Sequence, residues 1–195
     1  MENEPLNSQE RSILLGIARH AIEKSVNQLP IDELDIYKFP QRLQEQGASF
    51  VTLTLDDQLR GCIGSLEAYQ PLALDVQEHA VAAALEDYRF PPVMPGEVEM
   101  LEIEISCLTP SQPLDYSSSQ ELISKLRPGI DGVVLRSGMR RSTFLPQVWE
   151  KLPTPQEFLT QLCYKMGASG DLWQREKLQV LTYQVEEFRE SIENK

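Results

Sequence analysis

The sequence predicts an α+β fold made of mostly antiparallel sheets flanked by helices. Residues 13–22 carry apolar side chains at helical spacing, whereas residues 50–55 and 101–107 alternate between apolar and polar side chains. Turn residues at Gly132 and Gly138 separate short apolar stretches, as in hairpins. Strands joined mainly by hairpins and mixed with helices define this class. The 195 residues, 41% of them hydrophobic, suffice for one domain or two small lobes with a sizeable core.

The first elements follow from capping and periodicity. Asn7 or Ser8 can cap a helix that runs to about Asn27. Residues 28–48 are polar, contain two prolines, and predict a connection with little regular structure. The alternation in residues 50–55 then predicts a half-buried strand.

The next strand contains Cys62 between two glycines, and its register can be predicted. A three-residue loop, residues 56–58, places Val51 opposite Ile63 and Thr52 opposite Cys62, which pairs apolar with apolar residues. In this register Arg60 and Cys62 share a face, about 7 Å apart at Cα.

The later elements alternate between helices and strands. Pro71 suits the first turn of a helix that continues to about Tyr88, where Pro91 and Pro92 prevent further helix. Ser118 and Glu121 form a capping box for a short helix. The remaining predictions are strands at 133–136 and 141–145, a helical turn at 146–149, a helix from about 155 to 166 capped by Gly167, and a final strand at 180–188.

Composition limits the classes of partner. The net charge of −12 makes nucleic-acid binding an unfavoured role, because the densest basic cluster has only three arginines: Arg136, Arg140 and Arg141. These arginines could clamp a carboxylate or phosphate, or be surface charge. No apolar run approaches the roughly 18 residues that span a bilayer, and the acidic start Met1–Pro5 lacks the features of a signal peptide. We therefore expect no membrane association and a cytoplasmic location.

The cysteines and histidines indicate neither disulfides nor a metal site. Three cysteines without a CxxC pair fit no disulfide framework and no zinc motif. Cys107 and Cys163 are expected in the core, and His79 is expected to be an exposed helix residue. We predict no metal and no cofactor.

Cys62 is the main candidate for chemistry. A nearby cation lowers a thiol pKa, so Arg60 could activate Cys62, or it could hold an anionic substrate. The loop that begins at Ser65 leads to a helix N-terminus that adds positive potential. Two glycines in one strand, Gly61 and Gly64, indicate a bulge, tight packing or close approach of a ligand. The alternative is that Cys62 is a small buried residue that only packs.

Two glutamates could assist such a thiol. Glu102 and Glu104 share one face of a predicted strand. They could form an acid/base pair or bind Arg60 or Arg89. They could equally be the solvated face of the strand.

Several segments, in order along the chain, resemble the AMMECR domain family, also called system protein A of AmmeMemoRadiSam gene clusters. The similarity covers about residues 10–188 and is strongest in the first of these blocks: Leu59–Ser65 (LRGCIGS), Glu86–Pro92 (EDYRFPP), Leu101–Ser106 (LEIEIS), Thr143–Trp149 (TFLPQVW) and Cys163–Gly167 (CYKMG).

The resemblance implies one domain over residues 8–190, built as a larger and a smaller lobe from intermixed segments, with the Arg60–Cys62 motif near a cleft between them. Residues 1–7 and 191–195 would be flexible ends. Within the matching blocks, the residues expected to bind a substrate or ligand are Arg60, Gly61, Gly64, Ser65, Arg89, Thr143 and Phe144.

The resemblance also implies work beside a Memo-type protein and a radical S-adenosylmethionine protein. The chain lacks the cysteine triplet of an iron–sulfur enzyme, so radical chemistry would belong to that partner. We expect either a cysteine-dependent enzyme or enzyme subunit, acting on a small molecule, peptide or protein, or a non-catalytic binding or adaptor module. The molecular activity of the family does not decide between them.

Overall fold

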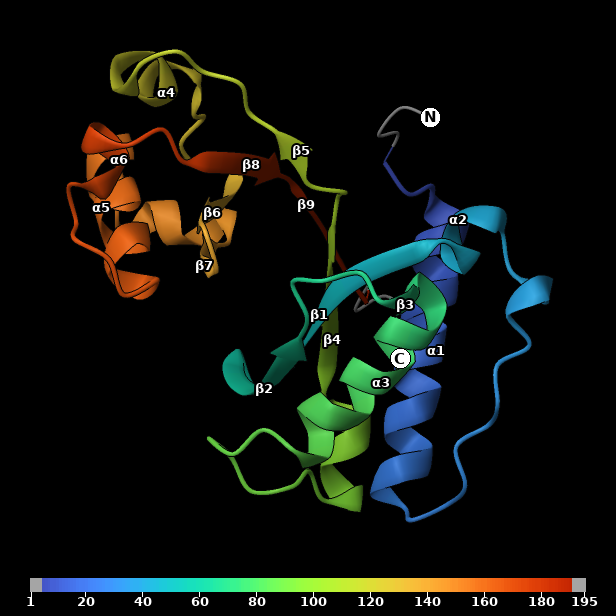
Figure 1. The fold of residues 1–195 in the computed structure, drawn as a ribbon. Helices are drawn as coiled ribbons and strands as arrows, with labels where there is room; N and C mark the ends of the chain where they lie inside the picture. The colour runs from blue at the N-terminus through green and yellow to red at the C-terminus, as the bar shows by residue number, and fades with distance from the viewer. Residues whose placement is uncertain (1–4, 191–195) are drawn as a thin grey trace. The chain divides into compact units, whose positions relative to one another are not determined.

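The computed structural model describes residues 5–190 and contains two compact units (Figure 1). Unit 1 comprises the described residues up to Leu108 and those from Glu186 onward, and unit 2 comprises Thr109–Val185. Unit 2 is therefore an insertion between two strands of unit 1, β4 (Glu102–Leu108) and β9 (Val185–Arg189).

Unit 1 begins with the predicted helix. α1 (Ser8–Val26) is capped by Asn7, whose side chain accepts the N–H of Glu10 while the Glu10 carboxylate accepts the N–H of Asn7. Residues 5–7, predicted to be a flexible end, are anchored: Leu6 is buried and its N–H donates to Glu186 at 2.9 Å. The other predicted flexible residues, 1–4 and 191–195, lie outside the described residues.

The connection predicted for residues 28–48 is wrong in its second half. A short 3₁₀ helix, η1 (Ile36–Lys38), and one helical turn, α2 (Gln41–Gln44), precede β1 (Gln46–Leu55). β1 starts four residues before the predicted strand because β3 (Gln70–Pro71), which lies far along the chain, pairs with its first two residues. Pairing with a distant segment is not visible in local periodicity.

The first sheet has the order β2 (Gln58–Gly64), β1, β4, β9, with β3 also pairing with β1. The pairs given by register are antiparallel, which confirms the predicted α+β class. The apolar residues of β1 and β4 pack against α1 and α3 (Leu72–Leu85) in the core of unit 1: Val51, Leu53, Ile103 and Ile105. Figure 1 shows these two helices on the same side of β1 and β4.

The β1–β2 hairpin has the predicted pairing at its centre and a different turn. Thr52 lies opposite Cys62, as predicted, but the turn contains two residues, Asp56 and Asp57, both with positive φ. A bulge at Arg60 adds one residue to β2 and restores the predicted register beyond it. The predicted three-residue loop is therefore wrong, although it gave the right partner for Cys62.

α3 ends at Leu85, three residues earlier than predicted, and it contains a buried polar cluster. His79 was expected to be exposed but is only 6% exposed, because its ring contacts the fully buried Asp75 one turn earlier. Asp75 also accepts the hydroxyl of Ser49 from β1 at 2.6 Å. A charged partner on the same helix face lets a histidine lie against the sheet.

Unit 2 contains the second sheet, ordered β5 (Gln112–Pro113), β8 (Gln179–Tyr183), β6 (Gly132–Ser137) and β7 (Arg140–Phe144). The single strand predicted at 180–188 is wrong: β8 and β9 belong to different sheets. The break falls at Gln184, whose N–H donates to the hydroxyl of Thr109 while its carbonyl accepts the Thr109 N–H.

Helices cover the core of unit 2. They are α4 (Ser119–Lys125), η3 (Pro146–Glu150), α5 (Pro155–Lys165) and α6 (Leu172–Arg175). The 3₁₀ helix η2 (Pro95–Met100) belongs to unit 1 instead. The ring of Trp149 stacks on Phe158 at 3.7 Å, and Gly167 ends α5 with a φ of +72°. Cys163 and Cys107 are buried, as predicted. Within residues 5–190, no helix has the length and apolar character needed to cross a membrane.

Candidate functional site

Cys62 lies on the face of the first sheet that is turned away from α1 and α3. Thr52, its partner on β1, donates its hydroxyl to the Cys62 sulfur at 3.3 Å. On its other side Thr52 pairs with Glu104 of β4. Cross-strand partners share a face, so these three side chains form the "Cys62 row", which spans about 10 Å at Cα.

Glu104 has the electrostatics of a proton acceptor. Partial burial raises the pKa of Glu104, and the neighbouring carboxylate of Glu187 raises it further, whereas Arg189 opposes the shift. Glu102 lies two residues away on the same face, opposite Thr54. The structure therefore places both predicted glutamates on the Cys62 face, with Glu104 in the row itself.

Asp87 and Arg89 hold the backbone of Cys62. The N–H of Cys62 donates to Asp87 Oδ2 at 2.8 Å, and Arg89 Nη2 donates to the Cys62 carbonyl at 3.1 Å. β2 is an edge strand, and this "Cys62 clamp" fills the hydrogen-bonding positions that a neighbouring strand would take. A peptide could add to β2 at Cys62 only by displacing the clamp.

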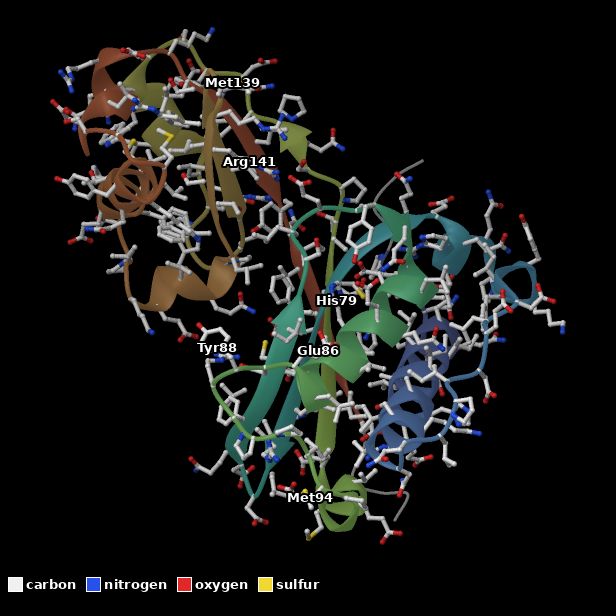
Figure 2. The ribbon with its side chains drawn as sticks, turned by 60° about the horizontal axis from the view of Figure 1, so that its bottom comes forward. His79, Glu86, Tyr88, Met94, Met139 and Arg141 are labelled. Atoms are coloured by element: carbon white, nitrogen blue, oxygen red, sulfur yellow. The ribbon has the colours of Figure 1, made fainter. Side chains whose placement is uncertain are left out.

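The clamp is a strong ion pair. Arg89 Nη2 lies 2.6 Å from Asp87 Oδ2, and Arg89 Nε lies 2.9 Å from Asp87 Oδ1. Hydrogen bonds from Arg89 lower the pKa of Asp87 well below its usual value, and the Cys62 N–H adds to the effect despite burial. Both residues come from the loop that follows α3, and the residue between them in the sequence is Tyr88, which is labelled in Figure 2.

Sequence reasoning missed the role of Asp87. The residue stood in the second matching block, beside Arg89. The available signal was the acidic side chain two residues before an arginine, in a segment that ends a helix. Nothing in that spacing indicated that the partner would be the backbone of Cys62.

Arg60 has a different environment from the one expected. Arg60 Nε lies 2.9 Å from Glu97 Oε1, and its Nη atoms donate to the carbonyls of Pro91 and Pro92 and to Glu97. Its side chain is 12% exposed. The guanidinium is neutralised and occupied within unit 1, where it ties the bulge of β2 to η2 and the loop before it.

Both glycines of the motif have internal packing reasons. A Cβ at Gly61 would lie 2.1 Å from the carbonyl oxygen of Ala83 in α3, and a Cβ at Gly64 would lie 2.4 Å from the carbonyl oxygen of Ser49. Ser65 follows, with its N–H donating to that same carbonyl and its hydroxyl bonding the backbone of Glu67. A ligand that approaches the glycines is not needed to explain them, and it stays a prediction.

Thr143 and Phe144 belong to unit 2, where they form a cluster of their own. The Thr143 hydroxyl lies 3.2 Å from that of Tyr183, and Lys165 donates to the Thr143 carbonyl at 2.9 Å. The same ammonium lies 4.9 Å from the centroid of the Phe144 ring. Burial raises the pKa of Tyr183 to about 12. These contacts join two of the matching sequence blocks to each other.

The buried polar cluster of unit 1 is not a hydrolytic triad. Asp75 Oδ2 accepts from the Ser49 hydroxyl and lies 3.1 Å from His79 Nδ1, so the aspartate stands between the other two. A triad requires the histidine to contact the hydroxyl instead. Across residues 5–190, no group of three or more His, Cys, Asp or Glu side chains is arranged to hold a metal ion.

Comparisons with known proteins agree with the matching blocks. The chain is 36% identical to a protein of Thermofilum pendens over 95% of this chain and 92% of the other, and 36% identical to one of Methanothermobacter thermautotrophicus over 97% and 99%. The crystal structure of an uncharacterised protein from Pyrococcus horikoshii superposes with a TM-score of 0.73 at 32% identity, covering 91% of this chain and 90% of that one. The AMMECR1 family model matches residues 15–188, and the chain therefore belongs to the AMMECR1 family.

Proposed function

We propose that this protein is a thiol-dependent enzyme or enzyme subunit that acts through Cys62 on a small-molecule or protein substrate. The Cys62 row supports this proposal most directly. The Thr52 hydroxyl donates a hydrogen bond to the Cys62 sulfur, and Glu104, whose pKa is raised, lies in the same row. Hydrogen bonding to sulfur favours its thiolate form, which is the nucleophile.

The proposed step is a nucleophilic attack. The thiol proton of Cys62 passes to the Thr52 hydroxyl, its hydrogen-bond partner, as that hydroxyl passes its own proton on toward the Glu104 carboxylate at the other end of the row. The sulfur forms a bond to an electrophilic carbon. The bond from that carbon to its leaving group breaks, and the leaving group departs with the bonding electrons. The Cys62 clamp fixes the Cys62 backbone during the step, which limits the entropy lost in reaching the reactive geometry.

Alkylation of single cysteines tests the proposal. We expect iodoacetamide to modify Cys62 in the folded protein much faster than it modifies the two buried cysteines. Burial raises the pKa of Cys107 and of Cys163, so these two serve as slow internal controls in the same peptide mass spectra. Cys62 that reacts only after unfolding would contradict the proposal.

Two threonines on one strand sharpen this test. Thr52→Val removes the hydroxyl that donates to the sulfur while keeping the shape of the side chain, and should slow the alkylation of Cys62 about fivefold at pH 7. Thr54→Val is the matched control, because Thr54 lies two residues away on the same face, opposite Glu102. Equal rates in the two variants would remove Thr52 from the mechanism.

A competing proposal is a non-catalytic adaptor that binds the Memo-type and radical S-adenosylmethionine proteins. The observation that favours it is Tyr88, which is 94% exposed between the two residues of the clamp. Exposed aromatic residues on a fixed backbone often dominate protein interfaces. If Tyr88→Ala abolishes binding to a purified Memo-type protein while Cys62→Ser does not, the adaptor role is favoured over catalysis.

A further inference from the structure

We propose that Arg89 is the anion-binding group of the Cys62 site, so that the electrophile carries a small oxyanion, such as a carboxylate, close to the carbon that is attacked. The inference rests on the proposed function, because it names the substrate class of the same site. It assigns to Arg89 the role that sequence reasoning offered to Arg60.

Arg60 has no nitrogen left to bind an anion. All three of its nitrogens donate to Glu97 or to proline carbonyls, and its side chain is 12% exposed. Binding an anion there would require breaking the contacts that hold the bulge of β2. Its positive charge is also compensated by the Glu97 carboxylate, whose pKa is lowered by that contact.

Arg89 has one nitrogen, Nη1, that can bind an anion. Its Nε and Nη2 atoms face Asp87, and Nη2 also donates to the Cys62 carbonyl. For Nη1, no hydrogen-bond partner is present among residues 5–190, and the side chain is 44% exposed. The planar group is thus held on one side and offers both N–H bonds of Nη1 on the other.

This arrangement suits recognition of an anion beside the thiol. The ion pair with Asp87 fixes the guanidinium, so little side-chain entropy is lost when a ligand binds. Hydrogen bonding to Asp87 raises the pKa of Arg89, and the nearby Cys62 and Tyr88 add to the shift, which places the thiol and the phenol within electrostatic range of the guanidinium. Tyr88, labelled on the loop in Figure 2, precedes Arg89 in the sequence and has an exposed side chain.

The chain as a whole repels anions. Its net charge of −12 should slow the reaction of any exposed thiol with a negative reagent relative to a neutral one. An anion preference at Cys62 would therefore require a local donor. Iodoacetate and iodoacetamide differ mainly in this charge, and both react by forming a sulfur–carbon bond as iodide leaves with the bonding electrons.

The experiment measures the rate of Cys62 alkylation by each reagent, with the ratio of the two rates normalised to that of free cysteine at the same pH and salt. We expect iodoacetate to be favoured about fivefold in the wild type at low salt, and the preference to disappear in 1 M NaCl. Arg89→Gln should abolish it. Lys38→Gln is the control, because Lys38 of η1 is exposed in the same unit and its loss changes the net charge equally.

The outcomes separate this inference from the proposed function. If Cys62 resists both reagents until the protein unfolds, the proposed function fails. If Cys62 reacts but shows no iodoacetate preference, or the preference survives Arg89→Gln, only the anion site is overturned. Unreactive Cys107 and Cys163 show that the variant is folded. Should Arg89→Gln expose them, the salt dependence in the wild type decides the question without a substitution.

Discussion

At the residue scale, Asp87 joins two stretches of chain that lie 25 residues apart. Its two oxygens accept the backbone N–H of Cys62, the backbone N–H of Arg89 and two guanidinium donors. Asp87 is only 5% exposed, so the charge of its carboxylate is stabilised by these donors rather than by water. Acid should therefore weaken the link between β2 and the loop after α3.

Asp87→Asn should lower the free energy of unfolding by about 2 kcal/mol at pH 7, because it removes the charge that the donors face. The pKa of Asp87 is lower in the folded state than the usual unfolded value of about 3.9, so folding is favoured by its ionisation above that value. The stabilisation is lost as pH falls below about 4. Urea unfolding between pH 7 and pH 3 should show the difference between wild type and variant shrinking at the acid end.

Asp171→Asn provides the comparison. Asp171 also pairs with an arginine, Arg175, but both side chains are more than half exposed. Exposed pairs contribute little, so this variant should match the wild type at every pH. A wild-type advantage over Asp87→Asn that stays constant down to pH 3 would show that the carboxylate charge is not what stabilises the clamp.

At the scale of elements, the sequence was informative wherever periodicity and capping decide the structure. α1 and its cap, the apolar faces of β1 and β4, and the pairing of Thr52 with Cys62 could all be predicted from local pattern. The two-residue turn could not be predicted in this way, because two aspartates adopt the positive φ angles for which glycine or asparagine is the usual signal. The bulge at Arg60 compensates for that shorter turn.

The site was only partly predictable for a related reason. Cys62 and Glu104 could be chosen by residue type and strand face. The Cys62 clamp could not be predicted, because it depends on side chains of one loop that contact the edge of a strand distant in sequence. For the same reason Arg60, which local pattern placed beside the thiol, has its contacts with η2 instead.

Gly61 is the contact between β2 and α3. Gly61→Ala should destabilise unit 1 by more than 2 kcal/mol, because the new Cβ would lie 2.1 Å from the carbonyl oxygen of Ala83 and the backbones would have to separate. Thermal or urea unfolding followed by circular dichroism measures the loss. Gly96→Ala is the control, since no heavy atom lies within 4 Å of a Cβ at Gly96. A stable Gly61→Ala protein would return Gly61 to the role of admitting a ligand.

At the scale of the whole molecule, each unit has a hydrophobic core of its own. The core of unit 2 is built around Trp149 and Phe158, and all of its buried members lie within Thr109–Val185. The two ends of this segment are bonded to each other through Thr109 and Gln184. An insertion with adjacent ends and its own core is the kind of segment that folds independently.

We therefore expect the fragment 109–185 to fold alone and to unfold cooperatively in urea. The two tryptophans of the chain, Trp149 and Trp173, are both buried in unit 2, so tryptophan fluorescence follows this unit in the intact protein as well as in the fragment. The fluorescence midpoints of the two should coincide. A fragment of this size buries a limited core, so the transition should have a small dependence on urea.

A shorter fragment, 109–178, tests whether the second sheet is required. It lacks β8, the strand that lies between β5 and β6 and contributes Val180 to the core. It should show no cooperative fluorescence transition, because β6 would lose one of its two neighbours and β5 its partner. If 109–185 also lacks a transition while the intact chain has one, unit 2 depends on unit 1 for its stability, and the two cores must be treated as a single cooperative structure.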